Sequence, residues 1–269
     1  MTSNALTGWR RVASAMWPAP SDPQIYGQLE IGAAALLAFI ERARSAGQHL
    51  TVTHLVARAL TTALEAVPEL NVRIVGSRAV TRPRIEIFFI TSMRAGQDDL
   101  SGVKVDTTRC NVFELAEQLT RGVNTLRDGH DPSFARAKRT MDRLPRPVLR
   151  AALHVSALAS ERLQLRLPWL GIERSPFGSA IISSVGSLGL PSGFAPLSWM
   201  YDVPLLILIG EVCERACVVD GSIVARAVLP LSITIDHRYV DGVHLGRALR
   251  ALRAYLEDPA AYERSISAP

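Results

Sequence analysis

The sequence has few of the features that mark secreted or membrane proteins. It contains three cysteines, Cys110, Cys213 and Cys217, and this odd number, with no histidine at metal-ligand spacing, predicts neither a disulfide framework nor a metal site. No apolar run precedes the first charges at the N-terminus, so a secretory signal is not expected. The uncharged stretch 175–201 holds four glycines and three prolines, which exclude a spanning helix. We therefore expect a soluble, cytoplasmic protein in which Cys213 and Cys217 are small core residues.

The chain also lacks internal repeats, low-complexity linkers and phosphate-binding loops. Neither Gly-x-Gly-x-x-Gly nor Gly-Lys-Ser/Thr occurs. Gly186, Gly189 and Gly193 follow a strand pattern, but Pro191 stands where a helix would have to begin, which favours a turn-rich loop. The 269 residues, with a hydrophobic content of 48%, are sufficient for one sizeable core. We predict a single domain, residues 1–269.

The periodicity of the apolar residues predicts an α/β fold, with a mixed sheet covered by helices. Strand patterns cover residues 24–31, 85–93, 179–185, 204–212 and 223–235, and helical patterns cover residues 9–17, 33–46, 54–67, 112–126 and 243–256. Thr53 is a candidate cap for the third helix, and Asn111 with Glu114 for the fourth. Strands and helices alternate too irregularly for a strict β-α-β repeat.

His237 is the candidate catalytic residue. A strand pattern ends just before it, and a helical pattern starts just after Asp241-Gly242, so the imidazole lies in a tight turn at the end of a sheet. Neutral imidazole, with an ordinary pKa of about 6.5, is suited to remove a proton near neutral pH. The alternative is a core histidine satisfied by the backbone, and the polar turn around His237 favours catalysis.

The segment around this histidine, Asp236-His-Arg-Tyr-Val-Asp-Gly242, resembles the active-site signature of dihydrolipoyl acyltransferases, the core subunits of 2-oxoacid dehydrogenase complexes. It is also similar to the His-x-x-x-Asp-Gly motif of chloramphenicol acetyltransferase and of nonribosomal condensation domains. Further segments fall in the family's order, namely Arg11–Met16, Val67–Asn71, Gly178–Gly186, Pro204–Gly210 and Leu256–Pro259. The resemblance covers nearly the whole chain except one internal segment.

The resemblance implies a chloramphenicol acetyltransferase-like fold and acyl transfer with coenzyme A or acyl-CoA as substrate, without a metal. His237 is then the general base, and Ser183 matches the serine or threonine that stabilises the oxyanion. Ser184 remains an alternative, because a strand serine can also form only local hydrogen bonds. The resemblance further implies trimers, or larger assemblies of trimers, with the active site between subunits, so that His237 and Ser183 could come from different chains.

Asp241 has two interpretations. Aspartate is a favoured N-cap, so it could cap the helix that starts at Val243. The resemblance implies instead a buried ion pair with an arginine of the first helix, which would hold the histidine turn in shape. Arg11 is the first candidate partner and Arg10 the second. We expect Arg238 to be solvated or interfacial, as we do Arg247.

The sequence departs from the family in several places. Its residues start at the catalytic region, and we expect no lipoyl domain, so that a lipoylated substrate would come from another protein. Gln24 stands where a histidine is expected, and residues 94–103 replace a Thr-Pro-x-Gly-Leu turn, which puts the usual acyl-carrier contacts in doubt. We expect a stand-alone CoA-dependent acyltransferase. The alternative is a non-catalytic assembly core of the same fold.

The largest departure is an insertion at about 129–176. Its nine basic residues are Arg136, Lys138, Arg139, Arg143, Arg146, Arg150, Arg162, Arg166 and Arg174, and its four acids are Asp131, Asp142, Glu161 and Glu173. The difference of five equals the net charge of +5 of the whole chain. The first interpretation is a helical segment packed on its own domain or on a trimer neighbour. The second is a docking surface for an acidic protein, a phosphate-rich cofactor or an anionic membrane. No nucleic-acid partner is expected.

Overall fold

The computed structural model describes residues 22–92, 100–128, 145–167, 173–197 and 201–263. Within these, a sheet of seven strands has the order β1-β9-β7-β6-β4-β5, and β8 pairs with a far part of β9. The strands are β1 (Gln24–Gly32), β4 (Glu86–Ser92), β5 (Leu100–Asp106), β6 (Ala180–Ser184), β7 (Leu205–Ile209), β8 (Cys213–Val219) and β9 (Ser222–Asp236). A separate hairpin consists of β2 (Val72–Val75) and β3 (Arg78–Thr81). The pairs β4–β6 and β6–β7 are parallel and the others antiparallel, so the mixed sheet of the α/β prediction is confirmed.

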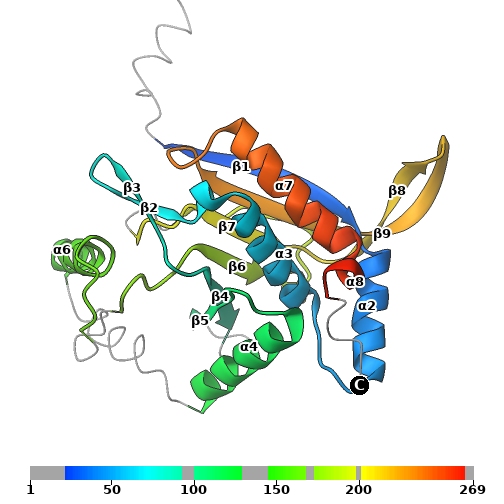
Figure 1. The fold of residues 1–269 in the computed structure, drawn as a ribbon, viewed down its shortest axis with the longest axis horizontal. Coiled ribbons are helices and arrows are strands. Elements are labelled where there is room, and N and C mark those ends of the chain that lie inside the picture. The colour runs from blue at the N-terminus through cyan, green and yellow to red at the C-terminus, as the bar shows by residue number, and fades with distance from the viewer. Residues whose placement is uncertain (1–21, 93–99, 129–144, 168–172, 198–200, 264–269) are drawn as a thin grey trace, which may run out of the picture.

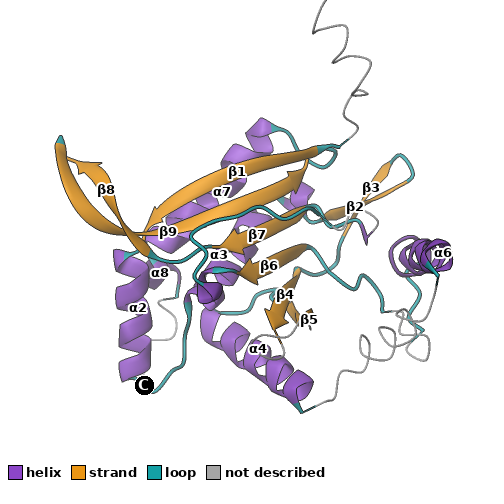
Figure 2. Cartoon of the chain, turned by 180° about the vertical axis from the view of Figure 1, so that it is seen from behind, coloured by secondary structure: helices purple, strands orange, loops and turns teal. Residues whose placement is uncertain are grey.

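The helices lie mainly on one face of this sheet (Figure 1). They are α2 (Ala34–Ser45), α3 (Val52–Ala66), α4 (Val112–Arg127), α6 (Arg146–Ala157), α7 (Gly242–Glu257) and α8 (Pro259–Tyr262), with short turns η1 (Pro68–Leu70), η2 (Leu158–Arg162) and η4 (Gly186–Leu188). Figure 2 shows the opposite face, which is crossed by loops and has no helix of the described part lying across β1, β9 and β7.

The two faces carry separate apolar clusters because side chains alternate along each strand. On β6, Ile182 belongs to the main core under the helices, whereas Ile181 packs with Leu197, Val203, Leu206 and Leu208 on the other face. The second cluster is small, and its loops leave large apolar side chains at the surface. Tyr26 is 54% exposed and stacks edge-on against Phe194, which is 50% exposed.

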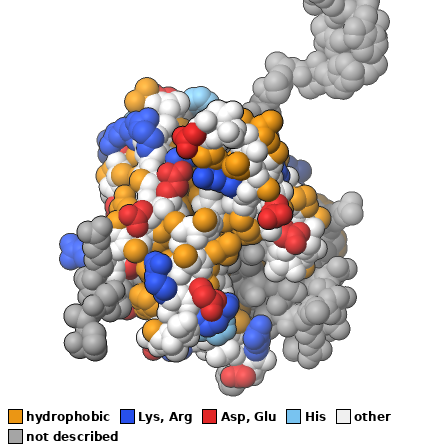
Figure 3. All heavy atoms as spheres, turned by 90° about the vertical axis from the view of Figure 1, so that its right-hand side faces the viewer, with side chains coloured by type: hydrophobic (Ala, Val, Ile, Leu, Met, Phe, Trp, Pro, Cys, Tyr) orange, Lys and Arg blue, Asp and Glu red, His pale blue; other side chains and the backbone are white. Residues whose placement is uncertain are grey.

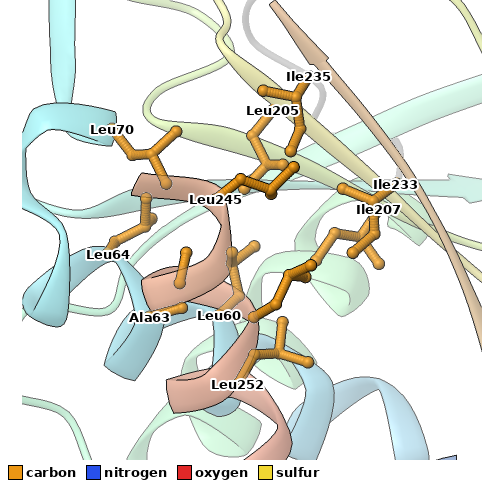
Figure 4. Close-up of a pocket in the computed structure, with 12 residues that line it drawn as sticks. Leu60, Ala63, Leu64, Leu70, Leu205, Ile207, Ile233, Ile235, Leu245 and Leu252 are labelled. Atoms are coloured by element: carbon orange, nitrogen blue, oxygen red, sulfur yellow. The ribbon is translucent and has the colours of Figure 1, made fainter. Parts of the chain in front are cut away.

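The main core is closely packed between α3, α7 and the sheet (Figure 4). Leucine and isoleucine side chains from the helices and from β7 and β9 surround a void of about 20 Å³. Its lining is entirely apolar, so the void offers a water molecule no hydrogen-bond partner, and we expect it to be dry. This region is packing and not a ligand site.

Strand β8 and the first half of β9 form an arm that extends away from the body of the sheet (Figures 1 and 2). Its side chains include exposed apolar ones, with Val218 75% and Ile223 78% exposed. Figure 3 shows apolar side chains at the surface at this end of the molecule, interspersed with charged ones. Cys213 and Cys217 lie on this arm and are half-buried, so the prediction that they fill the core was wrong.

Most predicted elements are present, and the N-cap of one predicted helix is corrected. Helix α3 begins two residues earlier than its predicted cap implied, because Thr51 and His54 form a capping box in which the Thr51 N–H donates to His54 Nδ1 at 3.2 Å. The Asn111–Glu114 capping box of α4 is confirmed. The helix expected at residues 9–17 lies outside the described residues. No helix in the described ranges combines the length and apolarity needed to cross a membrane.

Candidate active site

His237 is the first residue after β9, and backbone hydrogen bonds hold His237 and the residue before it, Asp236. The Asp236 N–H donates to Pro204 O at 2.9 Å, and the His237 N–H donates to Pro23 O at 2.9 Å. The His237 residue itself is exposed. The sheet therefore fixes the backbone of the turn and presents the histidine to solvent, as the strand-to-helix pattern predicted.

A charge-assisted clamp shapes the turn. Arg238 Nε donates to both carboxylate oxygens of Asp236 at 3.0 Å, and its Nη2 makes a further bond to the same group. Asp236 is 2% exposed, and its carboxylate raises the pKa of Arg238. Arg238 is solvated as expected, with a side chain that is 47% exposed, and it forms this clamp in addition. Arg247 also has a defined contact, since its Nη2 donates to Ala66 O at 2.8 Å.

Asp241 is the N-cap of α7. Its Oδ1 accepts from the N–H groups of Val243 at 2.9 Å and His244 at 3.2 Å, and it contacts His244 Nδ1 at 2.7 Å. These hydrogen bonds, first of all the one from the His244 backbone, lower the pKa of the exposed carboxyl group. The alternative partners, Arg11 and Arg10, lie outside the described residues, so the ion pair stays a prediction.

Ser183 lies at the C-terminal end of β6. It shares a sheet face with Ile181, on the side that the helices leave free, whereas Ser184 shares the helix-covered face with Ile182. Both serines line an open cavity of about 730 Å³ together with residues of α3, α4 and β4. The polar residues of this cavity also include His54.

His54 was assigned no role from the sequence. Burial lowers its pKa to about 4, with a smaller contribution from His49, so it is a neutral imidazole near pH 7. Because Nδ1 accepts the Thr51 N–H, the proton of the neutral ring is on Nε2. The capping-box spacing Thr51-x-x-His54 was the signal that could have identified it.

His237 and Ser183 lie at opposite ends of the sheet. The register aligns Ser183 with Leu208 on β7, and Leu208 with Ser232 on β9. His237 follows Ser232 by five residues, which at about 3.4 Å per residue is about 17 Å along the strand, in addition to about 10 Å across two strand spacings. A general base must come within about 3 Å of the group it deprotonates, or act through one water. One chain does not bring these two side chains together.

Gln24 occupies the position where the resemblance suggested a histidine. Its Oε1 accepts from the Leu197 N–H at 2.7 Å, and its Nε2 donates to both carboxylate oxygens of Asp22, at 2.9 and 3.0 Å. Gln24 thus ties the start of β1 to the loop on the free sheet face. No group of three or more potential metal ligands occurs among the residues that the structure describes.

The sequence as a whole matches the family described as 2-oxoacid dehydrogenases acyltransferase (catalytic domain), over residues 2–130 and 174–263. The chain belongs to this family. The match to the acyltransferase family omits residues 131–173, which correspond closely to the insertion expected at about 129–176.

The chain is similar to the dihydrolipoyllysine-residue acetyltransferase component of the acetoin cleaving system of Bacillus subtilis. The identity is 27% over 216 residues, covering 80% of this chain and 43% of that protein. The chain thus spans less than half the length of this member of the acyltransferase family.

Solved structures show the same fold. The cubic core of the pyruvate dehydrogenase multienzyme complex matches with a TM-score of 0.64 and 19% identity, covering 90% of this chain and 84% of that one. Dihydrolipoamide acetyltransferase of Azotobacter vinelandii matches with a TM-score of 0.64 and 18% identity, over the same shares of the two chains. The latter was solved to study the catalytic role of a serine and of a histidine and an asparagine four residues apart.

The insertion is partly integrated in the domain. Among its basic side chains, Arg162 lies 3.6 Å from Asp202, and Arg166 lies 3.2 Å from Glu173. Arg174 Nε donates to Gln164 at 2.7 Å. Four further basic residues of the insertion lie outside the described residues. Of these contacts, the one from Arg162 to Asp202 leaves the segment, and Arg73 Nη1 of β2 donates to the Glu161 carbonyl at 2.7 Å. These two contacts support the interpretation in which the segment packs on its own domain.

Proposed function

We propose that the protein is a CoA-dependent acyltransferase that moves an acyl group between a CoA thioester and a thiol such as that of a lipoyl group, or another acceptor. The observation that carries this proposal is the position of His237. It is exposed at the end of the buried strand β9, in a turn fixed by two backbone hydrogen bonds, within the signature of an acyltransferase family. A histidine that served only the core would be buried.

The chemistry needs a base and an oxyanion donor. The His237 imidazole takes the S–H proton of the acceptor thiol while the sulfur attacks the thioester carbonyl carbon. The Ser183 hydroxyl donates a hydrogen bond to the oxyanion of the tetrahedral intermediate. As the intermediate collapses, the carbon–sulfur bond to CoA breaks, and the imidazolium returns its proton to the CoA thiolate.

The site is shared between two copies of the chain. His237 and Ser183 are separated by the length of the sheet within one copy, so the histidine of one copy has to approach the serine of another. The free sheet face and its loops offer an apolar surface for this contact, with Tyr26 and Phe194 about half exposed. A heterologous contact of this kind closes into a ring, and the resemblance to the family implies a trimer.

The cavity beside Ser183 is the place for the acyl thioester. Its volume, about 730 Å³, is in the range of small-molecule sites, and its lining combines apolar side chains with hydroxyl and imidazole groups. Arg127 at its border supplies a positive charge suited to the phosphates of CoA. No metal ion is needed in this scheme, because the imidazole and the hydroxyl supply both functions.

The test is an acyl-transfer assay with a panel of acyl-CoA thioesters and with dihydrolipoamide and simple amines as acceptors. We expect turnover with a thiol acceptor for at least one acyl-CoA, and loss of turnover in His237→Ala. If native mass spectrometry finds neither CoA nor acyl-CoA bound, and no pair in the panel reacts, the protein is instead an assembly core without catalytic activity.

A further inference from the structure

The insertion that the family match omits delivers a buried carboxylate into the domain. Glu161, in η2, has a side chain that is 1% exposed, and it contacts one arginine in β2 and another directly after β3. Arg73 Nη1 donates to the Glu161 backbone carbonyl at 2.7 Å, and Arg82 Nη2 lies 3.7 Å from the Glu161 carboxylate. The Ser175 hydroxyl donates to the same carboxylate at 3.1 Å. Burying a carboxylate costs free energy unless it is paired and hydrogen-bonded, so these contacts indicate that this part of the insertion is packed into the domain.

Arg82 connects this carboxylate to Asp202. Its Nη2 donates to the Asp202 carbonyl at 2.9 Å, while Arg162, also from the insertion, lies 3.6 Å from the Asp202 carboxylate. Asp202 has a φ of 48°, in the left-handed region that residues other than glycine seldom adopt. The contacts from Arg82 and Arg162 therefore hold a strained backbone in place.

Asp202 leads directly to the turn that carries His237. Two residues later, Pro204 O accepts the Asp236 N–H at 2.9 Å. The negative charge of the Asp202 carboxylate also acts on Tyr239 in the turn. Burial raises the pKa of Tyr239 most, and the charges of Asp202 and then Asp236 raise it further. In Figure 1 the C-terminal end of β9, the β2–β3 hairpin and α6 all lie on the same side of the molecule, away from the end of β6.

We propose that the insertion positions the catalytic turn, with Glu161 as the positioning residue that acts through Arg82 and Asp202 on the backbone beside His237. This proposal rests on the acyltransferase function proposed above. Glu161 touches no substrate in this scheme. Its effect is on the fraction of molecules in which the His237 turn has its active geometry.

The contacts of Glu161 also make this effect depend on pH. Burial outweighs the Arg82 charge at 3.7 Å and raises the pKa of Glu161 to about 7. The Asp202 charge raises this pKa further, whereas the Ser175 hydrogen bond and Arg73 lower it. Burial raises the pKa of Tyr201, and the Glu161 charge raises it further. The carboxylate is therefore ionised above about pH 7 and protonated below it, when it no longer attracts Arg82.

The kinetic test compares Glu161→Gln with Glu173→Gln, a carboxamide control in the same segment whose ion pair with Arg166 is exposed. At pH 8 we expect Glu161→Gln to lower kcat about ten- to a hundredfold, the scale of a small misplacement, with an unchanged KM for acyl-CoA. The ratio of wild-type to Glu161→Gln kcat should approach one near pH 6, because wild-type Glu161 is then protonated. The control should match the wild type at both pH values. The proposal is overturned if this kcat ratio stays near one at pH 8, or if it is the same at pH 6 as at pH 8.

Hydrogen exchange provides a readout that does not need activity. In Glu161→Gln at pH 8, the amides of Asp236 and Tyr239, which are hydrogen-bonded to Pro204 O and Asp236 O, should exchange several-fold faster than in the wild type. Arg162→Gln, at a side chain that is 43% exposed and so safer for folding, should produce a smaller change at the same amides. Unchanged exchange in both variants contradicts positioning. If the wild type transfers no acyl group, the proposed function fails, and the exchange result still decides whether the insertion orders the turn.

Discussion

At the scale of single residues, the account depends first on His237. His237→Ala should lower kcat by about 10²–10⁴-fold, the usual cost of losing a general base. The fold should persist, because the residue is exposed and its backbone N–H, which the substitution keeps, makes the contact to Pro23. Steady-state kinetics and thermal unfolding measure the two effects. His244→Ala, at a histidine two residues beyond the signature, is the control, and near-normal turnover in His237→Ala would refute the assignment.

The two neighbouring serines make a second test at this scale. Ser183 lies on the free face of the sheet and Ser184 on the helix-covered face, so only Ser183 shares the face that we propose contacts a second copy of the chain. Ser183→Ala should reduce kcat much more than it changes KM, since the hydrogen bond matters mainly in the transition state. Kinetics of Ser184→Ala serve as the control. A larger loss of kcat in Ser184→Ala would mean that the donor is on the other face.

The local structure around the candidate residues could be predicted from the sequence, but their tertiary contacts could not. The strand, the turn and the helix around His237 follow from local periodicity and from the capping preference of Asp241, and both are confirmed. The clamp between Arg238 and Asp236 depends on the burial of Asp236, which no local pattern reveals. The contact between Glu161 and Arg82 joins residues far apart in the chain, so spacing gives no indication of it.

At the scale of elements, α7 is held mainly by the apolar stripe that packs on α3 and the sheet. Leu252 is 2% exposed and lines the small void shown in Figure 4. Leu252→Ala should enlarge this void and lower the free energy of unfolding by about 2–5 kcal/mol. Val243, on the same helix, is 71% exposed, so Val243→Ala should change it by less than about 0.5 kcal/mol. Urea titrations of both variants measure the difference, and equal midpoints would contradict the packing described.

Strands were predicted well where they are long or fully buried and poorly elsewhere. β6 and β7 contain buried apolar runs and β9 is 15 residues long, whereas β2 and β3 have four residues each and β3 is largely exposed. β5 was missed for another reason. It contains Gly102, and a glycine in a sequence usually suggests that a strand is interrupted. Here the glycine makes room for the Phe88 ring, since a Cβ on residue 102 would lie 2.1 Å from that ring.

At the scale of the whole molecule, the fold means that the proposed site requires an assembly of two or more copies. His237 and Ser183, the proposed general base and oxyanion donor, lie at opposite ends of one sheet, and the sheet face between them lacks a helical cover among the described residues. The sequence could suggest this only through its resemblance to a family of trimers, because the register of the strands is a tertiary property. The cytoplasmic location stays a prediction.

The measurement that tests this central claim most directly is complementation between two inactive variants. The His237→Ala and Ser183→Ala proteins are mixed in equal amounts, unfolded, refolded together and assayed for acyl transfer. If each site takes His237 from one copy and Ser183 from the next, random assembly restores about a quarter of the wild-type sites. If both residues act within one chain, no mixture contains an intact site, and activity that stays at the level of the separate variants would contradict the account.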